Sequence, residues 1–227
     1  MKLLRQLICA GILGAAGLAS TRADVIYDSY GSANGFTFPL ANGQEIGNQI
    51  TLTPGLWTLT NFTIEYYSPQ LLFTNNVGIE VRFYANDGPS TNGFVTPMTP
   101  IWDSGWFYNT ALGGMPANGY QIVTYSGTDF PTGGLLLNMP NANLTFTITF
   151  TNLDGGNLVS LPLANNQTGI SYGDYWVNYG GNWTLMTNAS SAANFVVNFS
   201  GVPEPTTLGL AILGGALLLG AKLRRKR

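Results

Sequence analysis

Residues 144 to 151 read Leu144-Thr-Phe-Thr-Ile-Thr-Phe-Thr151, a strict alternation of apolar and polar side chains. Successive side chains of a β-strand point to opposite faces of the sheet, so Leu144, Phe146, Ile148 and Phe150 must share one face. We expect the four threonines to face outward. The stretch therefore predicts a strand with one face in the core, and it indicates a fold built from sheets.

The same period of two recurs on both sides of this strand, bounded by Gly, Pro, Asn and Asp, whereas helical periodicity is hard to find. One register change, near Asn61, interrupts the alternation of the longest segment. Without intervening helices the segments cannot form βαβ units. We therefore predict one all-β domain at 24–201, an antiparallel β-sandwich with jelly-roll-like topology. The predicted strands cover residues 24–27, 36–38, 48–52, 56–67, 78–84, 101–107, 121–125, 144–151, 175–179, 182–185 and 195–199.

The residue types that are missing narrow the chemistry of this domain. The chain has no histidine, and its one cysteine, Cys9, lies before the domain begins. Disulfides, thiol nucleophiles, imidazole acid–base catalysis and the usual zinc and copper sites are therefore excluded from the domain. We expect no catalytic residue, no metal site and no cofactor, and we do not expect an enzyme.

The charge of the domain is one-sided. Between residues 24 and 201 stand ten acidic residues and one basic residue, Arg82, so the domain carries a net charge of −9, which the two basic ends conceal in the value of −2 for the whole chain. Without a basic patch to neutralise phosphates, nucleic acid is not an expected partner. Solubility is the simpler interpretation of the excess acid, and binding of divalent cations or basic partners is the alternative.

The first 23 residues have the three parts of a secretory signal peptide. Met1-Lys-Leu-Leu-Arg5 is basic, 7–19 is apolar, and Thr21-Arg22-Ala23 places small residues at the −3 and −1 positions of a cleavage site. We expect cleavage after Ala23, with Ala19 and Ser20 as alternatives. The chain is then exported through a secretion translocon.

The last 26 residues, 202–227, contain a second export-related signal. The triplet Pro203-Glu204-Pro205 follows Val202, and residues 206–221 contain no ionisable side chain. As a helix these sixteen residues would rise about 24 Å, which just spans a bilayer with help from the flanking residues. A basic cluster ends the chain and is expected to stay in the cytoplasm, with the domain outside: Lys222, Arg224, Arg225, Lys226 and Arg227.

This order of triplet, apolar helix and basic end resembles the PEP-CTERM sorting signal of exported proteins of Gram-negative bacteria. The resemblance implies that a membrane-embedded exosortase reads Val202, Pro203, Glu204 and Pro205 and removes the helix near them. It further implies an inner-membrane precursor and a mature form at the cell surface or in the exopolysaccharide matrix, with exopolysaccharide as a candidate partner. The alternative is a plain tail anchor. Looser stretches at 81–89 and 101–105, and 174–176 together with 182–185, look similar to segments in the bodies of such proteins and supply no active site.

Three groups of residues in the domain are candidate sites. Arg82 is expected to form a structural ion pair with Glu80, Glu65 or Asp103, and a ligand-binding arginine is the alternative. The segments 86–88 and 152–157 are expected to be turns, with calcium loops as the alternative. The candidate carbohydrate contacts combine flat rings with hydrogen-bonding groups, although the same composition is typical of an aromatic core: Asp174, Trp176, Asn178 and Trp183.

These features predict an exported surface or matrix protein whose domain is a non-catalytic structural or weak carbohydrate-binding module. A glycoside hydrolase on a sandwich scaffold is the alternative, because that chemistry needs only two carboxylates. Two carboxyl groups about 5 to 10 Å apart in an open groove lined by tryptophan would favour the hydrolase.

Overall fold

The computed structural model describes residues 23–30, 33–55, 57–68, 76–108, 119–137, 143–153, 159–164, 168–187 and 194–203. The predicted leader before Ala23, the residues Glu204 and Pro205, the apolar segment 206–221 and the basic cluster lie outside these residues. Within them the one helical element is the short 3-10 turn Gly127–Asp129, and no helix has the length and apolar character needed to cross a membrane.

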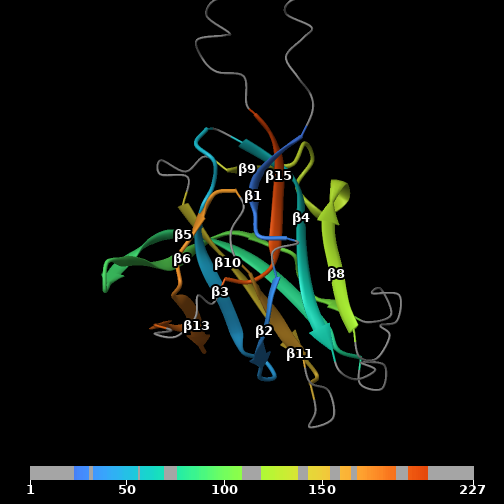
Figure 1. Ribbon diagram of the computed structural model, residues 1–227. Helices are drawn as coiled ribbons and strands as arrows, with labels where there is room; N and C mark the ends of the chain where they lie inside the picture. The colour runs from blue at the N-terminus through green and yellow to red at the C-terminus, as the bar shows by residue number, and fades with distance from the viewer. Residues whose placement is uncertain are drawn as a thin grey trace, which may run out of the picture.

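The described chain forms two antiparallel sheets that pack face to face (Figure 1). The prediction of an all-β, sandwich-like domain is therefore confirmed. The first sheet contains β1 (Asp24–Asp28), β2 (Ala33–Leu40), β4 (Trp57–Ser68), β8 (Gly119–Ser126), β9 (Leu135–Leu137), β11 (Val159–Ala164) and β15 (Val197–Pro203). The second contains β3 (Glu45–Thr51), β5 (Gly78–Thr91), β6 (Phe94–Asp103), β7 (Phe107–Tyr108), β10 (Asn143–Thr151), β12 (Ile170–Ser171), β13 (Tyr175–Tyr179) and β14 (Asn182–Met186).

The strand orders set which segments lie side by side. In the first sheet the order is β1-β15-β4-β11-β2, and β8 and β9 also pair with β4. Asn61 to Ile64 of β4 pair with both β15 and β8, and Tyr67 of β4 pairs with both β11 and β8. β8 therefore lies on one edge of β4, while β15 and β11 lie one after the other along the opposite edge. In the second sheet the order is β14-β13-β3-β10-β5-β6, which places β10 in the middle.

The core lies between the two sheets, and the alternating strand supplies its centre. Leu144, Phe146, Ile148 and Phe150 are all fully buried, as their spacing predicts. From the opposite sheet, the ring of Phe62 packs against the ring of Phe146 at a centroid distance of 6.1 Å and against that of Phe83 on β5. Full burial of each such side chain is worth about 1.5–3 kcal/mol, so these alternating positions account for much of the cohesion between the sheets.

The predicted register change near Asn61 is confirmed. The pairing of β15 with β4 shifts between Ser200, opposite Asn61, and Gly201, opposite Leu59. Leu59 and Phe62 are both fully buried although three residues apart, which is possible only with the extra residue of a bulge between them.

Several predicted boundaries are wrong. The segment 101–107 is two strands, since β6 ends at Asp103 and β7 begins at Phe107, with Gly105 between them at φ +64°. The segment 86–88 is not a turn but part of β5, which continues to a hairpin turn at Asn92 and Gly93, both with positive φ. Strand β15 begins at Val197, and Phe195 forms only an isolated bridge. The strands β9, β11 and β12 are not predicted.

The threonines of β10 lie on the outer face of the second sheet, as expected, but they are not at the surface. Thr145, Thr147 and Thr149 are 0%, 1% and 6% exposed. Side chains of neighbouring strands cover them, and Thr147 donates a hydrogen bond to the Glu45 carboxylate at 2.7 Å. The outer face of this sheet therefore carries a layer of polar side chains, formed by the threonines of β10 and the side chains of neighbouring strands that cover them.

Candidate functional site

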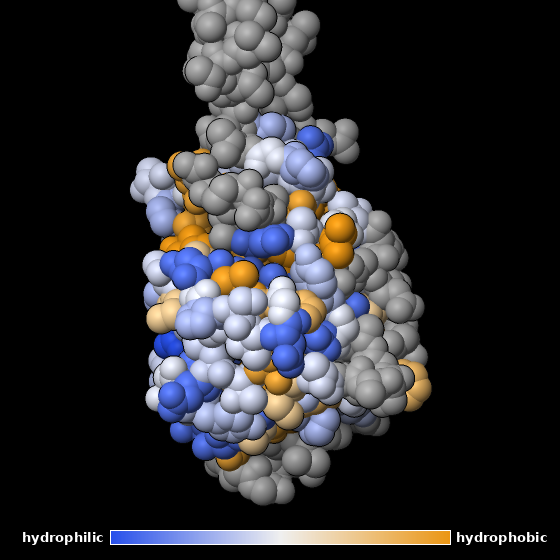
Figure 2. All heavy atoms as spheres, turned by 90° about the vertical axis from the view of Figure 1, so that its left-hand side faces the viewer, coloured by the Kyte–Doolittle hydropathy of each residue, from blue (hydrophilic) through white to orange (hydrophobic). Residues whose placement is uncertain are grey.

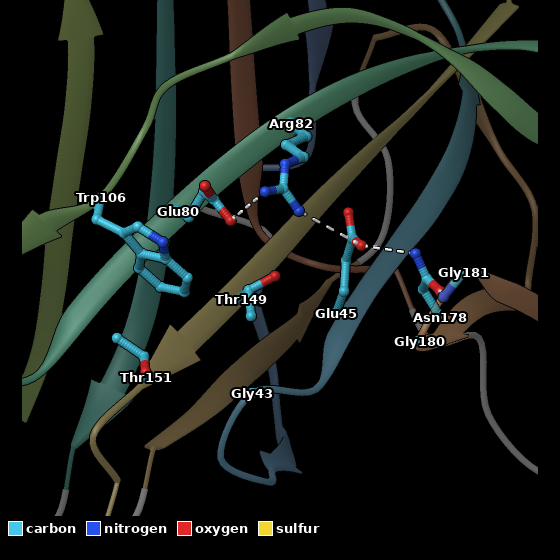
Figure 3. A pocket seen from close by; sticks show the side chains of 10 residues that line it. All are labelled: Gly43, Glu45, Glu80, Arg82, Trp106, Thr149, Thr151, Asn178, Gly180 and Gly181. Carbon is cyan, nitrogen blue, oxygen red and sulfur yellow. Dashed lines mark hydrogen bonds and ion pairs between the residues drawn. The ribbon is translucent and has the colours of Figure 1, made fainter.

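The polar layer surrounds a hollow of about 270 Å³ on the outer face of the second sheet (Figure 3). Its lining comes from β3, β5, β10 and β13 and from the loops beside them: Gly43, Glu45, Glu80, Arg82, Trp106, Thr149, Thr151, Asn178, Gly180 and Gly181. On the face of the molecule that Figure 2 shows, the described surface is mostly hydrophilic or neutral, with apolar residues in small groups. The lining of the hollow itself is rich in charged, hydroxyl and amide groups, so the hollow is a polar site.

Strand register builds the floor of the hollow. Thr149 of β10 is opposite Glu80 of β5 on one side and opposite Glu45 of β3 on the other. The three residues form one row across the sheet, so their side chains emerge on the same face. With about 4.8 Å between neighbouring strands, the Cα atoms of the two glutamates are roughly 10 Å apart.

Arg82 lies between these two glutamates. Its Nη2 is 2.7 Å from Oε2 of Glu80, its Nε donates to Oδ2 of Asp103 at 2.8 Å, and its Nη1 is 3.7 Å from Oε2 of Glu45. The predicted ion pairs with Glu80 and Asp103 are confirmed. The pair with Glu65 is wrong, because Glu65 lies on β4 of the other sheet, opposite Ile122. The contact with Glu45 is not predicted, since the strand expected at 48–52 begins too late to include it.

The Glu45 carboxylate is held by hydrogen bonds from three other side chains. The hydroxyls of Tyr84 and Thr147 donate to Oε1 at 2.9 and 2.7 Å, and the Asn178 amide donates to Oε2 at 2.8 Å. Asn178 is itself positioned by the backbone N–H of Gly181, which donates to its Oδ1 at 2.7 Å. Glu45 is therefore fixed in one orientation before any ligand arrives.

Glu80 has a raised proton affinity. Burial raises the pKa of Glu80 to about 7, and the negative charges of Asp103 and Glu45 act in the same direction, while Arg82 opposes them. In contrast, Arg82 holds the pKa of Asp103 below its usual range even though burial acts the other way. Glu80 is thus the group of the site that exchanges a proton near neutral pH.

The four candidate carbohydrate residues are placed differently from one another. Asn178 lines the hollow through its bond to Glu45. Trp176 is 1% exposed and buried in the sheet, and Trp183 is half-buried with its ring edge-on to Tyr84 at 5.2 Å. Asp174 is half-buried, and its backbone carbonyl accepts a hydrogen bond from Asn48. The one tryptophan among the described residues that lines the hollow is Trp106, which is not among these four residues. It lies two residues before Tyr108 in the chain.

No described residue of the two expected calcium or turn segments lines the hollow. In β5, the Asp87 carboxylate accepts hydrogen bonds from the backbone N–H of Thr99 at 3.0 Å and from its hydroxyl at 2.5 Å. Asp87 therefore joins the two strands of the hairpin β5–β6. Of the second segment, Asn152 has a positive φ of 60°, as a turn requires, and residues 154–157 lie outside the described part of the chain. The described residues contain no group of three or more Asp, Glu, His or Cys arranged to hold a metal ion.

The predicted sorting motif overlaps the end of the last strand. Val202 and Pro203 are the last two residues of β15, opposite Thr58 and Trp57 of β4. The predicted processing site therefore follows the last strand without a linker.

No protein-family model, curated protein or solved structure matches this chain.

Proposed function

We propose that this chain is an exported bacterial protein of the cell surface or exopolysaccharide matrix, sorted by its C-terminal signal and processed by an exosortase. The observation that carries the proposal is the three-part tail, with Pro203-Glu204-Pro205, the apolar segment 206–221 and the basic end in this order. A leader cleaved at Ala23 directs the chain to the translocon, and the tail holds the precursor in the inner membrane with the domain outside.

The position of the motif supports this proposal. Since β15 ends at Pro203, an enzyme that cuts beyond this residue removes no part of the sandwich. The first strand, β1, pairs with β15 so that Asp24 is opposite Gly201, and both ends of the domain leave at the same pole (Figure 1). A signal peptidase and a second membrane enzyme can therefore both act on one end of a folded domain.

The jelly-roll-like description belongs to the same proposal and is supported by strand order. The order β2-β11-β4-β8 in the first sheet and β3-β10-β5-β6 in the second is the order of two interlocked four-stranded sheets in a jelly roll. The remaining strands extend these two sheets at their edges and ends.

We assign the body a non-catalytic role, structural or weakly carbohydrate-binding, with the hollow as the binding site. Two glutamates within about 10 Å beside Trp106 meet part of the condition for a glycoside hydrolase. However, the Arg82 guanidinium contacts both carboxylates and lies in the space between them, where a hydrolase places the anomeric carbon and the attacking water. Hydrogen bonding to polar groups of a bound sugar is the chemistry that this arrangement favours.

Processing in the native host tests the sorting proposal. Mass spectrometry of the mature protein is expected to find no peptide from residues 208–227. In the variant Glu204→Gln, loss of one charge-assisted hydrogen bond, worth roughly 1.5–3 kcal/mol, should slow processing about ten- to a hundred-fold, so that precursor accumulates in the inner membrane.

Replacing Arg224, Arg225, Lys226 and Arg227 by serine is the matched contrast. It leaves the triplet intact and weakens the stop-transfer signal, so it should impair membrane retention and not recognition. Equal processing of the wild type and the Glu204 variant, with a mature form that keeps its helix, would leave only a plain tail anchor.

A further inference from the structure

The charges of the hollow do not balance. Three carboxylates, those of Glu45, Glu80 and Asp103, surround the single guanidinium of Arg82. Arg82 is the only lysine or arginine between residues 24 and 201, so no other side chain of the domain supplies a positive charge. A ligand that brings a positive charge would correct the imbalance, whereas an anionic ligand would increase it.

Thr149 provides an independent indication of a ligand at the same place. Its side chain is 6% exposed and lines the hollow between Glu80 and Glu45 (Figure 3). The neighbouring hydroxyls of Thr145 and Thr147 donate to Asn86 and Glu45, but the Thr149 hydroxyl has no hydrogen-bond partner among the described residues. Thr149 as a residue is largely buried, but its hydroxyl is open to the hollow, where a bound polar group can reach it.

Trp106 supplies an apolar surface beside these polar groups. It is 39% exposed, and its indole lies next to the Glu80 side chain (Figure 3). A flat, partly exposed ring can pack against the apolar face of a sugar ring, and it also attracts a nearby ammonium group. The three features therefore select a ligand that combines a ring, hydroxyl groups and a positive charge.

We propose that the hollow binds an amino sugar with a free, protonated amine, which lies on the Thr149 side of the Arg82 guanidinium within reach of the Glu80 and Glu45 carboxylates, with its hydroxyl groups at Thr149 and its ring against Trp106. This inference rests on the proposed carbohydrate-binding function and specifies its ligand class. The raised pKa of Glu80 is compatible with it, because burial keeps this carboxyl partly protonated and an adjacent ammonium group favours its ionised form.

Binding of three matched oligosaccharides to the full chain in detergent micelles tests the inference. The probes are β-1,4-linked tetramers of glucosamine, N-acetylglucosamine and glucose, measured by isothermal titration calorimetry at pH 6.5 and low salt. The glucosamine tetramer should bind at least ten-fold more tightly than the two uncharged tetramers, and added salt should weaken only its binding.

The possible failures are distinguishable. Equal affinity for all three tetramers would overturn the amine preference and leave the carbohydrate-binding function in place. Binding of none of them would overturn both the inference and the carbohydrate-binding role, while the sorting proposal depends on its own experiment. Displacement of the glucosamine tetramer by millimolar calcium would also overturn the amino-sugar inference, because the hollow would then be a metal-cation site.

Two variants locate the binding. Thr149→Val keeps the β-branched shape and removes a hydroxyl without a protein partner, so it should leave the fold intact and weaken glucosamine binding about ten-fold. Glu80→Gln keeps the shape of the protonated acid but cannot ionise against the bound amine, so it should weaken glucosamine binding by a similar factor. Glu65→Gln, the same substitution on the other sheet, is the control and should bind as the wild type does. Unchanged binding by both hollow variants would contradict the assignment.

Discussion

At the scale of single residues, the charged row on the second sheet shows what a sequence can and cannot predict. Arg82 and Glu80 are two positions apart on one strand, and Asp103 lies at the end of the next strand along the chain that pairs with it, so their pairing is predictable from alternation. The contact of Arg82 with Glu45 depends on how β3, β10 and β5 pair with one another. Glu45 and its partner Thr149 are about 100 residues apart in the chain, and no local sequence pattern indicates their register. The burial of Thr149 is unpredictable for the same reason.

The elevated pKa of Glu80 makes the stability of the fold depend on pH. In the unfolded chain this carboxyl has its ordinary pKa near 4.5, whereas in the folded domain the pKa is about 7. The folded state therefore binds the proton more tightly. The resulting stability is fully present below about pH 4.5 and is lost as the pH rises through about 7.

We expect the free energy of unfolding to fall by about 1–3 kcal/mol between pH 5 and pH 8. Urea unfolding of the wild type at several pH values checks this. The variant Glu80→Gln should reduce the slope, and part of it should remain because burial also raises the pKa of Glu65. An unchanged slope in Glu80→Gln would show that Glu80 is not the group responsible.

At the scale of elements, strict alternation identifies strands and its absence hides them. β10 and β13 are predicted with boundaries within one residue of those observed, because each alternates or has an aromatic, β-branched composition. β11 contains Pro162, and proline inside a run argues against a strand. The long hairpin β5–β6 had a usable signal in Asn92-Gly93, the dipeptide typical of type I′ turns.

Close approach of strands makes one glycine of β3 irreplaceable. A Cβ added to Gly47 would lie 1.9 Å from the carbonyl oxygen of Phe146 on β10, which is far inside van der Waals contact. We expect Gly47→Ala to destabilise the fold by about 3 kcal/mol, because the two backbones would have to separate.

Thermal unfolding compares this variant with Gly119→Ala. In β8 the nearest atom to an added Cβ at Gly119 is 3.6 Å away, at the end of the flexible Gln121 side chain. This control should therefore change stability by no more than about 0.5 kcal/mol. Similar effects of the two substitutions would contradict the close packing of β3 on β10.

At the scale of the whole molecule, the last strand holds the first sheet together. β15 lies between β1 and β4, and it buries Val197 and Phe199 completely. Its neighbours in space come from the start of the chain and from residues 57–64, so sequence patterns predict the strand but not its central position.

Two truncations test this position. A chain that ends at Pro203 should unfold at the same temperature as the full chain, since every paired residue of β15 is retained. A chain that ends at Asn194 should show no cooperative unfolding, because loss of β15 separates β1 from β4 and exposes part of the core. Circular dichroism during heating distinguishes the two. A cooperative transition in the shorter chain would mean that β15 is peripheral.

The placement of β15 also has a mechanical consequence. The turn at Gly43, which borders the hollow, follows the end of β2 at the pole opposite to the chain ends (Figure 1). If the hollow binds a matrix polymer and the tail is held in the membrane, as we propose, a pull on the polymer loads β15 along its length. The hydrogen bonds of β15 to β1 and β4 are perpendicular to that direction. A pull along the strand therefore loads all of these hydrogen bonds in shear at the same time, and they do not break one after another.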